Sequence, residues 1–373
     1  MTIPAPPSAP ISLRAFPAAW LRDNCDCPRC RDSRTGQKLF QVTDLPEGLA
    51  IGSEQMVERD GGTVWEVRWL PDGHVSRYAA DWLDAAGEAD DRTEDAKELW
   101  AADRFGDGQL PEALWHDYQR DDAERLRVLD AVARLGFALL REVPPRDGQV
   151  LAVAQTFGFV RETNYGRLFE VRVEESPSNL AFTSAAIAPH TDNPYRDPVP
   201  TLQLLHCLDN SAAGGDSSLI DGFAAAALLR AEDPAAFTVL ARTPVPFRFA
   251  DASAELRACK PLIGVDPRGR IREIRFNNRS TGTLRLPAAE TAAFYAAYRT
   301  FGDLLLRPDR GLDLRLAPGD CLVFDNVRLL HARTAFAAQG RRHLQGCYAD
   351  LDGLASSLAV LRRSAARAQA GGS

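Results

Sequence analysis

The sequence contains no apolar run of about 18 residues, the length that a helix needs to cross a bilayer. It also has no cluster of lysine and arginine, and its formal net charge of -7 gives no electrostatic footprint for nucleic acid or anionic lipid. Its first residues, MTIPAPPSAPISLRAFPAAW, lack the pattern of a secretory or transit peptide. We therefore expect a cytoplasmic protein that binds a small molecule and neither nucleic acid nor a membrane.

Compositional bias and internal repeats are absent as well. Hydrophobic residues make up 45% and charged residues 25% of the 373 residues, as in ordinary globular proteins, and the length has room for two domains or for one domain with an appendage. The 7 cysteines are odd in number and scattered, which argues against a disulfide framework. We interpret four of them as buried, unreactive core thiols: Cys207, Cys259, Cys321 and Cys347.

The N-terminal part has the pattern of a small β unit. In the stretch TVWEVRWLPDGHVSRY (63–78), a β-rich run is followed by a Pro-Asp-Gly turn and a second run, which predicts a hairpin. The stretch from 84 to 123 is acidic and weakly patterned, which is typical of a connector with a helix. We therefore predict a small N-terminal domain over 1–95, a connector over 96–122 and a main domain over 123–373.

The main domain begins with an amphipathic helix and continues mostly as short strands. DDAERLRVLDAVARLG (121–136) has apolar residues at helical spacing and ends at a glycine. Short β-rich runs dominate after it, interrupted by helical stretches after Gly222 and over 288–306. Many short strands without βαβ alternation predict an α+β, mainly β fold, with a barrel or jelly-roll core and flanking helices.

Three cysteines form a tight cluster in CDCPRC, with the spacing C-x-C-x2-C. Cys25, Cys27 and Cys30 are close enough to bind one ion, and His74, at the tip of the predicted hairpin, can complete a tetrahedral Cys3His site. A closed site of this kind stabilises a fold and leaves no open position for catalysis, so we predict structural Zn(II). The alternative is three reduced thiols in a loop.

The segment HTDNPYR (190–196) contains a second candidate metal site. In a strand, His190 and Asp192 point to the same face because alternate residues do. His331 follows the strand-like CLVFDNVRLL and can complete a set of two histidines and one carboxylate, which leaves positions open on Fe(II) for a co-substrate and oxygen. Arg342 begins a later strand, where its guanidinium can bind the far carboxylate of 2-oxoglutarate through two hydrogen bonds.

Together these motifs resemble a known family. WLRDNCDCPRC, HTDNPYR, LQLLHC, GGDSSLIDGF, FDNVRLLHART and RRHLQGCYAD are similar to segments of the γ-butyrobetaine hydroxylase-like Fe(II)/2-oxoglutarate dioxygenases, over nearly the whole chain. The resemblance implies a double-stranded β-helix (jelly-roll) core, a homodimer, a structural zinc and stimulation by ascorbate. It also implies these ligand sets: iron with His190, Asp192 and His331; 2-oxoglutarate with Arg342; zinc with Cys25, Cys27, Cys30 and His74.

The same family binds a trimethylammonium group in an aromatic cage. A quaternary ammonium cannot donate hydrogen bonds, so the faces of aromatic rings are its natural partners. The positions that resemble cage members are Tyr165, Phe169, Phe182 and Tyr348, and Asn179 is expected near the substrate too. Phe169 and Phe182 replace a Trp and a Tyr of the animal γ-butyrobetaine hydroxylases. Without the resemblance, each ring would be assigned to the core.

Two further departures concern the acid end of the substrate. Arg279, with Asn278 before it, lies in the segment that contacts the substrate acid in the family, and Asn193 takes a position that is usually apolar or aromatic in γ-butyrobetaine hydroxylases. A phosphonate has more charge and more acceptor oxygens than a carboxylate, which favours arginine and an added amide. The departures resemble the branch that hydroxylates 2-(trimethylammonio)ethylphosphonate. The alternative is that Asn193 only begins an Asn-Pro turn and Arg279 lies on the surface.

The expected reaction is hydroxylation of this phosphonate at C1 to (R)-1-hydroxy-2-(trimethylammonio)ethylphosphonate, with succinate and CO2 formed, as a first step of phosphonate catabolism. The nearest rival is γ-butyrobetaine hydroxylation to carnitine, and trimethyllysine hydroxylation is a more distant one. From other classes, an inactive binding module would have no use for the complete metal set. A zinc hydrolase would leave Arg342 and the cage unexplained.

Overall fold

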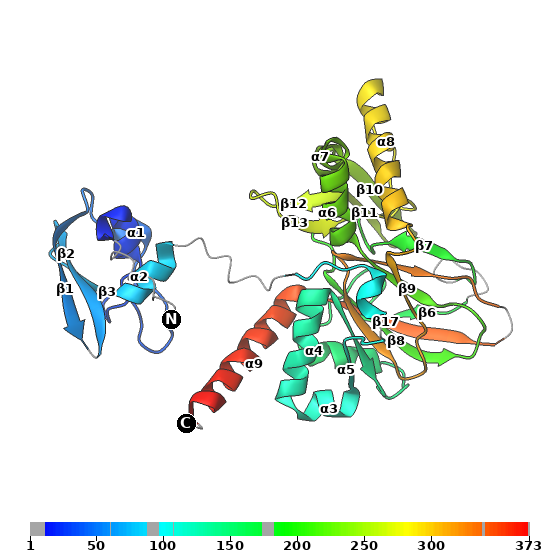
Figure 1. The fold of residues 1–373 in the computed structure, drawn as a ribbon, viewed down its shortest axis with the longest axis horizontal. Coiled ribbons are helices and arrows are strands. Elements are labelled where there is room, and N and C mark those ends of the chain that lie inside the picture. Colours follow the sequence, from blue (N-terminus) through cyan, green and yellow to red (C-terminus); the bar gives the residue numbers. More distant parts are fainter. Residues whose placement is uncertain are drawn as a thin grey trace, which may run out of the picture. The chain divides into compact units, whose positions relative to one another are not determined.

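The computed structural model describes residues 12–59, 61–87, 97–106, 108–173, 183–337 and 340–371. The chain divides into two compact units, Met1–Glu94 and Asp95–Ser373 (Figure 1). Among the residues described, no helix has the length and apolar character that a membrane span requires.

The first unit is built on a three-stranded antiparallel sheet. Its elements are η1 (Leu13–Ala15), α1 (Ala18–Asp23), η2 (Val42–Asp44), β1 (Ala50–Arg59), β2 (Gly62–Leu70), β3 (Val75–Ala79) and α2 (Ala80–Gly87). β2 and β3 confirm the predicted hairpin. β1 has no counterpart in the prediction, because most of its residues are exposed and its apolar residues do not alternate.

A small aromatic core holds this unit together. Val67, Trp69 and Tyr78 of the hairpin are buried with Leu21 of α1. The hydroxyl of Tyr78 donates a hydrogen bond of 2.5 Å to the carbonyl of Leu21, and Nε1 of Trp69 donates one of 2.9 Å to Ser76 Oγ. These contacts fix the chain that follows α1, which carries the cysteine cluster, against the hairpin that carries His74.

The second unit contains two main sheets. The larger has the strand order β4-β5-β15-β8-β17-β6 and the smaller the order β14-β9-β16-β7. The strands of the larger sheet are β4 (Glu112–Leu114), β5 (Phe137–Arg141), β15 (Cys321–Asp325), β8 (Leu202–Asn210), β17 (Arg342–Ala349) and β6 (Phe169–Val171). Those of the smaller are β14 (Gly311–Leu314), β9 (Ser217–Asp221), β16 (Leu329–Arg333) and β7 (Ile187–His190). Two hairpins accompany them: β10 (Val245–Ala250) with β11 (Glu255–Lys260), and β12 (Ile263–Val265) with β13 (Ile271–Ile274).

The two main sheets face each other across a shared core. Leu205, Phe324 and Leu344 of the larger sheet lie in one hydrophobic cluster with Leu219 and Leu312 of the smaller. Antiparallel sheets packed face to face in this way form a jelly roll. The predicted mainly β fold, a double-stranded β-helix with flanking helices, is confirmed.

Helices cover the two sheets from outside. They are η3 (Ala102–Phe105), α3 (Trp115–Arg120), α4 (Asp122–Leu135), α5 (Gln149–Gln155), α6 (Gly222–Glu232), α7 (Pro234–Arg242), α8 (Ala288–Leu305) and α9 (Leu351–Gly371). In Figure 1, α3, α4 and α5 lie on one side of the second unit and α6, α7 and α8 on the other. α4 confirms the predicted helix: the side chain of Asp121 caps its start, and Gly136, with φ of 90°, ends it.

The structure corrects two predictions. Residues 97–106 and 108–122 are part of the second unit and not a connector, because Trp100 packs against Phe137 at 5.7 Å between ring centroids and β4 pairs in parallel with β5. The burial of these short elements comes from tertiary contacts, which an acidic, weakly patterned stretch does not reveal. Cys259 is exposed on β11, whereas Cys207, Cys321 and Cys347 are buried as predicted.

Candidate functional site

Two neighbouring strands bring the predicted iron ligands together. β7 and β16 pair antiparallel with His190 directly opposite His331, and their imidazole centroids lie 4.2 Å apart. Asp192 follows β7 by two residues: its Oδ1 is 3.3 Å from Nε2 of His190, and its Oδ2 is 3.9 Å from Nε2 of His331. One ligand atom from each of the three residues lies within 4.8 Å of the others.

The protonation states of these residues suit a divalent metal. His190 Nδ1 lies 2.9 Å from the carbonyl of Ala188, so Nδ1 carries the proton and Nε2 keeps its lone pair toward Asp192. Burial lowers the pKa of His331 to about 3, which keeps its imidazole neutral. Burial alone would raise the pKa of Asp192, but its polar contacts with His190, His331 and Tyr348 outweigh burial and hold that pKa well below its usual range. Two imidazoles and a carboxylate are the donor set of a facial Fe(II) site.

These residues open into a cavity of about 480 Å³ in the second unit. Nine of the predicted site residues line it: Tyr165, Phe169, His190, Asp192, Asn193, Arg279, His331, Arg342 and Tyr348. Asn179 and Phe182 lie outside the described residues.

Arg342, at the start of β17, is fixed by a glycine. Its Nε donates a hydrogen bond of 3.1 Å to the carbonyl of Gly215. Gly215 has φ of +72°, and a Cβ there would lie 2.8 Å from Cδ of Arg342, so only glycine allows this approach. Within the described chain, the two terminal nitrogens of Arg342 have no hydrogen-bond partner. Burial lowers the pKa of Arg342, yet a guanidinium remains charged, so this group fits the far carboxylate of a dicarboxylic acid.

Aromatic rings line another part of the cavity. Phe169 packs on Tyr348 with centroids 5.0 Å apart, and Tyr165 packs edge-on against Phe249 at 5.7 Å. Tyr195 stacks on the same Phe249 at 5.1 Å. The sequence interpretation missed Tyr195 and Phe249. Tyr195 lies within HTDNPYR, whereas nothing in the run VPFRFA of β10 distinguishes Phe249 from a core residue.

Asn193 faces the cavity with an unpaired amide nitrogen. The residue is 3% exposed, its Oδ1 accepts a hydrogen bond of 2.9 Å from the Tyr195 hydroxyl, and its Nδ2 is buried without a hydrogen-bond partner among the residues that the structure describes. Asn193 also has φ of 58° and begins a turn, because the N–H of Arg196 donates to its carbonyl. The turn that the sequence suggested as an alternative is therefore present together with the cavity-facing amide.

The structure replaces Asn278 with its neighbour. Asn278 is exposed, its Oδ1 accepts from the Tyr298 hydroxyl at 3.4 Å, and it is not among the cavity-lining residues. Asn277 lines the cavity instead: it is 5% exposed, and its Nδ2 donates to the carbonyl of Thr191 at 3.1 Å. β13 ends at Ile274 and a turn begins at Asn278, where the side chain reaches solvent. Arg279 is exposed, as the alternative interpretation of the sequence expected, and it also lines the cavity.

The cavity wall is rich in arginine. Arg248 and Arg333, which the sequence interpretation missed, line it with Arg279 and Arg342. Burial lowers the pKa of Arg333 to about 10, and the charges of Arg342 and Arg279 add to the effect. Such a concentration of guanidinium groups suits anionic ligands.

The cysteine cluster in the first unit has the dimensions of a tetrahedral site. The sulfurs of Cys25, Cys27 and Cys30 lie 3.4, 3.6 and 3.6 Å from Nε2 of His74. Zinc bonds of roughly 2.3 Å to sulfur and 2.05 Å to nitrogen at a tetrahedral angle put S and N about 3.6 Å apart. Burial raises the pKa of Cys25 to about 11, so a thiolate there needs a neighbouring cation. The four residues therefore fit Zn(II).

Known proteins resemble both units. A family model described as "Taurine catabolism dioxygenase TauD, TfdA family" matches residues 96–348, and one described as "Gamma-butyrobetaine hydroxylase-like, N-terminal" matches residues 12–84. The chain is 39% identical to the gamma-butyrobetaine dioxygenase of Pseudomonas sp. (strain AK-1), over 93% of this chain and 91% of the relative. It is 32% identical to the Homo sapiens gamma-butyrobetaine dioxygenase, over 93% of this chain and 91% of that relative.

More distant similarities are to a trimethyllysine dioxygenase and to a solved structure. The mitochondrial trimethyllysine dioxygenase of Rattus norvegicus is 30% identical, over 94% of this chain and 83% of the relative. A crystal structure of a taurine dioxygenase from Burkholderia xenovorans superposes with a TM-score of 0.50 at 17% identity, over 65% of this chain and 88% of that one, which supports the fold alone. The family-model matches and the identities above 30% settle the assignment: the chain belongs to the γ-butyrobetaine hydroxylase-like family of Fe(II)/2-oxoglutarate-dependent dioxygenases.

Proposed function

We propose that this enzyme hydroxylates a small zwitterion with a trimethylammonium group at one end and an acid at the other, and that the substrate is 2-(trimethylammonio)ethylphosphonate, hydroxylated at C1. The observation that supports the phosphonate is the buried Nδ2 of Asn193 in the cavity wall, which has no hydrogen-bond partner in the described part of the chain. A buried amide without a partner is costly, so a ligand oxygen that accepts its hydrogen bond is the natural complement.

The metal and co-substrate roles are assigned to four residues. His190, Asp192 and His331 bind Fe(II), and Arg342 binds the C5 carboxylate of 2-oxoglutarate. Bound iron and 2-oxoglutarate supply the chemistry that reduces O2, releases succinate and CO2 and adds one oxygen atom to the substrate. The chain positions the reacting methylene within this arrangement and excludes water from it.

The cation end of the substrate is assigned to the aromatic part of the cavity. Tyr165, Phe169 and Tyr348 supply ring faces, and Tyr195 and Phe249 extend the same wall. Ring faces attract a desolvated quaternary ammonium by about 2 kcal/mol or more. Asn179 and Phe182 keep their predicted substrate roles as part of this proposal.

The acid end is assigned to the polar part of the cavity. Asn193 offers an N–H, Arg279 offers a guanidinium, and Asn277 takes the place first given to Asn278. A phosphonate has three oxygens and up to two charges, so it can use more of these donors than a carboxylate can. The product is then (R)-1-hydroxy-2-(trimethylammonio)ethylphosphonate by analogy with the family, in phosphonate catabolism.

A second candidate substrate is γ-butyrobetaine. The relatives at 39% and 32% identity are named gamma-butyrobetaine dioxygenases, and this similarity fits that substrate at least as well. The two candidates share the trimethylammonium group and the type of reaction, and they differ in the acid and, by one methylene, in the length of the chain before it. Asn193 and Arg279, which are assigned to the acid, therefore determine much of the preference between them. We also propose Zn(II) for the Cys3His cluster, a homodimer, and stimulation by ascorbate.

The decisive experiment measures succinate formation with Fe(II), ascorbate and 2-oxoglutarate, with each zwitterion offered separately and then in competition. We expect kcat/KM for the phosphonate to exceed that for γ-butyrobetaine by about tenfold or more, which corresponds to one hydrogen bond to a charged group. A preference for γ-butyrobetaine would assign the second candidate. Mass spectrometry of the products must show one added oxygen atom, and turnover of neither compound would reject both substrates.

A further inference from the structure

The turn that joins β15 to β16 places Asn326 against the main chain of Asp192. Oδ1 of Asn326 accepts a hydrogen bond of 2.8 Å from the N–H of Asp192. Its Nδ2 donates to the carbonyl of Asp192 at 3.1 Å and to that of Pro200 at 2.9 Å. These partners require oxygen on one side of the amide and nitrogen on the other, so the orientation of the side chain is unambiguous.

Asp192 depends on this contact because it lies beyond its strand. β7 ends at His190, and Asn193, with φ of 58°, turns the chain away. Among the described residues, only Asn326 bonds to the N–H and the carbonyl of Asp192. The carboxamide therefore replaces the neighbouring strand that would otherwise fix this residue.

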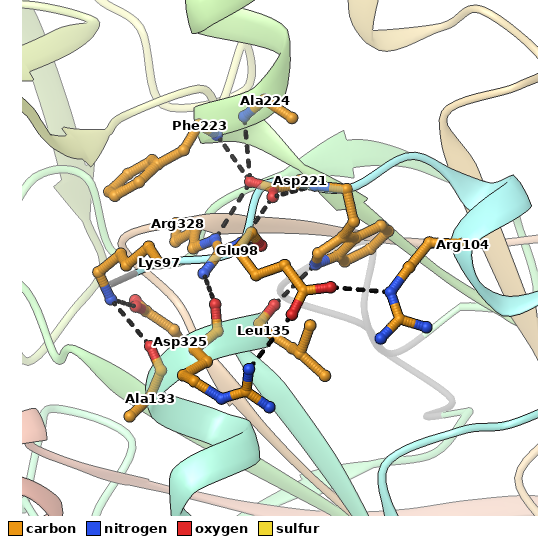
Figure 2. Close-up of polar contacts among 12 residues, drawn as sticks. Lys97, Glu98, Arg104, Ala133, Leu135, Asp221, Phe223, Ala224, Asp325 and Arg328 are labelled. Atoms are coloured by element: carbon orange, nitrogen blue, oxygen red, sulfur yellow. Dashed lines mark hydrogen bonds and ion pairs between the residues drawn. The ribbon is translucent and has the colours of Figure 1, made fainter. Parts of the chain in front are cut away.

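Asn326 is itself held rigidly. It is 1% exposed, and its N–H donates to the carbonyl of Thr201 at 2.9 Å. Its neighbour Asp325 forms an ion pair with Lys97 at 3.3 Å. Arg328, at the other end of the turn, forms an ion pair of 2.7 Å with Asp221, and both side chains are fully buried (Figure 2). A side chain fixed on both flanks can set the position of the group it contacts.

We propose that Asn326 is a positioning residue for the Asp192 carboxylate: it fixes the main chain of Asp192 so that the carboxylate faces His190 and His331 before a metal binds. This proposal rests on the assignment of Asp192 as a metal ligand, and it holds for any substrate. A group that orients a metal ligand raises metal affinity, typically by 10- to 100-fold.

The test is the affinity of the full-length, zinc-loaded protein for Mn(II), measured from the EPR signal of the free ion. Mn(II) prefers carboxylate and imidazole to thiolate ligands, so the cysteine cluster does not contribute to the measured Mn(II) binding. We expect Asn326→Ala to raise the Kd about tenfold or more. The matched control is Asn210→Ala, since Asn210 also donates from Nδ2 to a carbonyl, that of Leu316 at 2.7 Å, but it does not line the cavity. The control should change the Kd by less than about twofold, even if it lowers the melting temperature.

A second variant keeps the proposal testable if Asn326→Ala does not fold. Asn326→Asp has the same shape and still accepts from the N–H of Asp192, but it places a carboxylate oxygen against two carbonyls, so its Kd should also rise. Wild-type affinity in the folded variants would overturn the positioning role. Asp192→Ala separates this failure from a wrong metal assignment: if it too binds Mn(II) like the wild type, the ligand set itself is wrong.

Discussion

The hydroxyl of Tyr348 donates a hydrogen bond of 2.9 Å to Oδ2 of Asp192, while Oδ1 of the same carboxylate lies 3.3 Å from Nε2 of His190. The ring of Tyr348 also packs on Phe169 in the aromatic wall. One residue therefore contacts both the proposed metal ligand and the proposed cation site. The bond occupies one carboxylate oxygen and leaves the other for the metal.

Tyr348→Phe separates the two contacts, because it keeps the ring and removes the hydroxyl. A hydrogen bond to a charged group contributes about 1.5–3 kcal/mol, so kcat should fall by roughly tenfold to a hundredfold. KM for the trimethylammonium substrate should change little, since the ring face remains. Initial rates of succinate formation test this. Tyr298→Phe is the control, because the hydroxyl of Tyr298 contacts Asn278 outside the cavity. An equal loss of kcat in both variants would contradict the prediction.

The amide of Asn193 is best tested with Asn193→Asp. A leucine at φ of 58° would strain the backbone, whereas aspartate tolerates this conformation as asparagine does. The new carboxylate loses the N–H and repels an anion, so KM for the phosphonate should rise by about tenfold or more and KM for γ-butyrobetaine by less. Asn278→Asp adds the same charge outside the cavity and should leave both values nearly unchanged. An equal rise for the two substrates with Asn193→Asp would mean that the amide does not select the acid.

The buried pair of Arg328 and Asp221 makes a prediction about stability. Both side chains are 0% exposed, and Asp221 also accepts hydrogen bonds from the N–H groups of Phe223 and Ala224 (Figure 2). Arg328→Met leaves a buried, uncompensated carboxylate and should lower the free energy of unfolding by about 3–5 kcal/mol. Urea unfolding measures this. Arg299→Met, which removes a pair that is 86% and 72% exposed, should cost less than about 0.5 kcal/mol.

Zinc removal should unfold the first unit selectively. Its core is small, and the fit of the Cys3His cluster to Zn(II) makes metal binding part of its folding free energy. Cys30→Ser should prevent zinc binding and abolish the near-ultraviolet circular dichroism signal of the first unit's tryptophans. A strong chelator should have both effects on the wild-type protein. Cys259→Ser, at an exposed thiol outside the cluster, should keep both. Full zinc content in Cys30→Ser would reject the proposed ligand set.

The sequence predicted those features that local periodicity determines. Strand periodicity led to the pairing of His190 with Asp192, and the two side chains do meet, although β7 ends at His190 and Asp192 reaches it from a bend. The long gap to His331 is what a jelly roll requires when distant strands pair. The hairpin of the first unit and helix α4 follow from turn residues and amphipathic spacing.

Features that depend on tertiary contacts were not predictable in the same way. The exchange of Asn278 for Asn277 depends on where the turn after β13 begins. Phe249 enters the cavity from a hairpin whose position no local pattern specifies. Asn326 lies in the quoted motif FDNVRLLHART, yet its contact with Asp192 joins residues far apart in the chain.

The register of β7 and β16 also links metal supply to the lifetime of the protein. A slip of one residue would turn His331 to the opposite face and leave His190 without its partner, so only the correctly paired barrel can bind the ion. An ion that binds the folded state alone stabilises it by mass action. Cells short of iron would therefore hold this enzyme in a form that is both inactive and more easily unfolded and degraded.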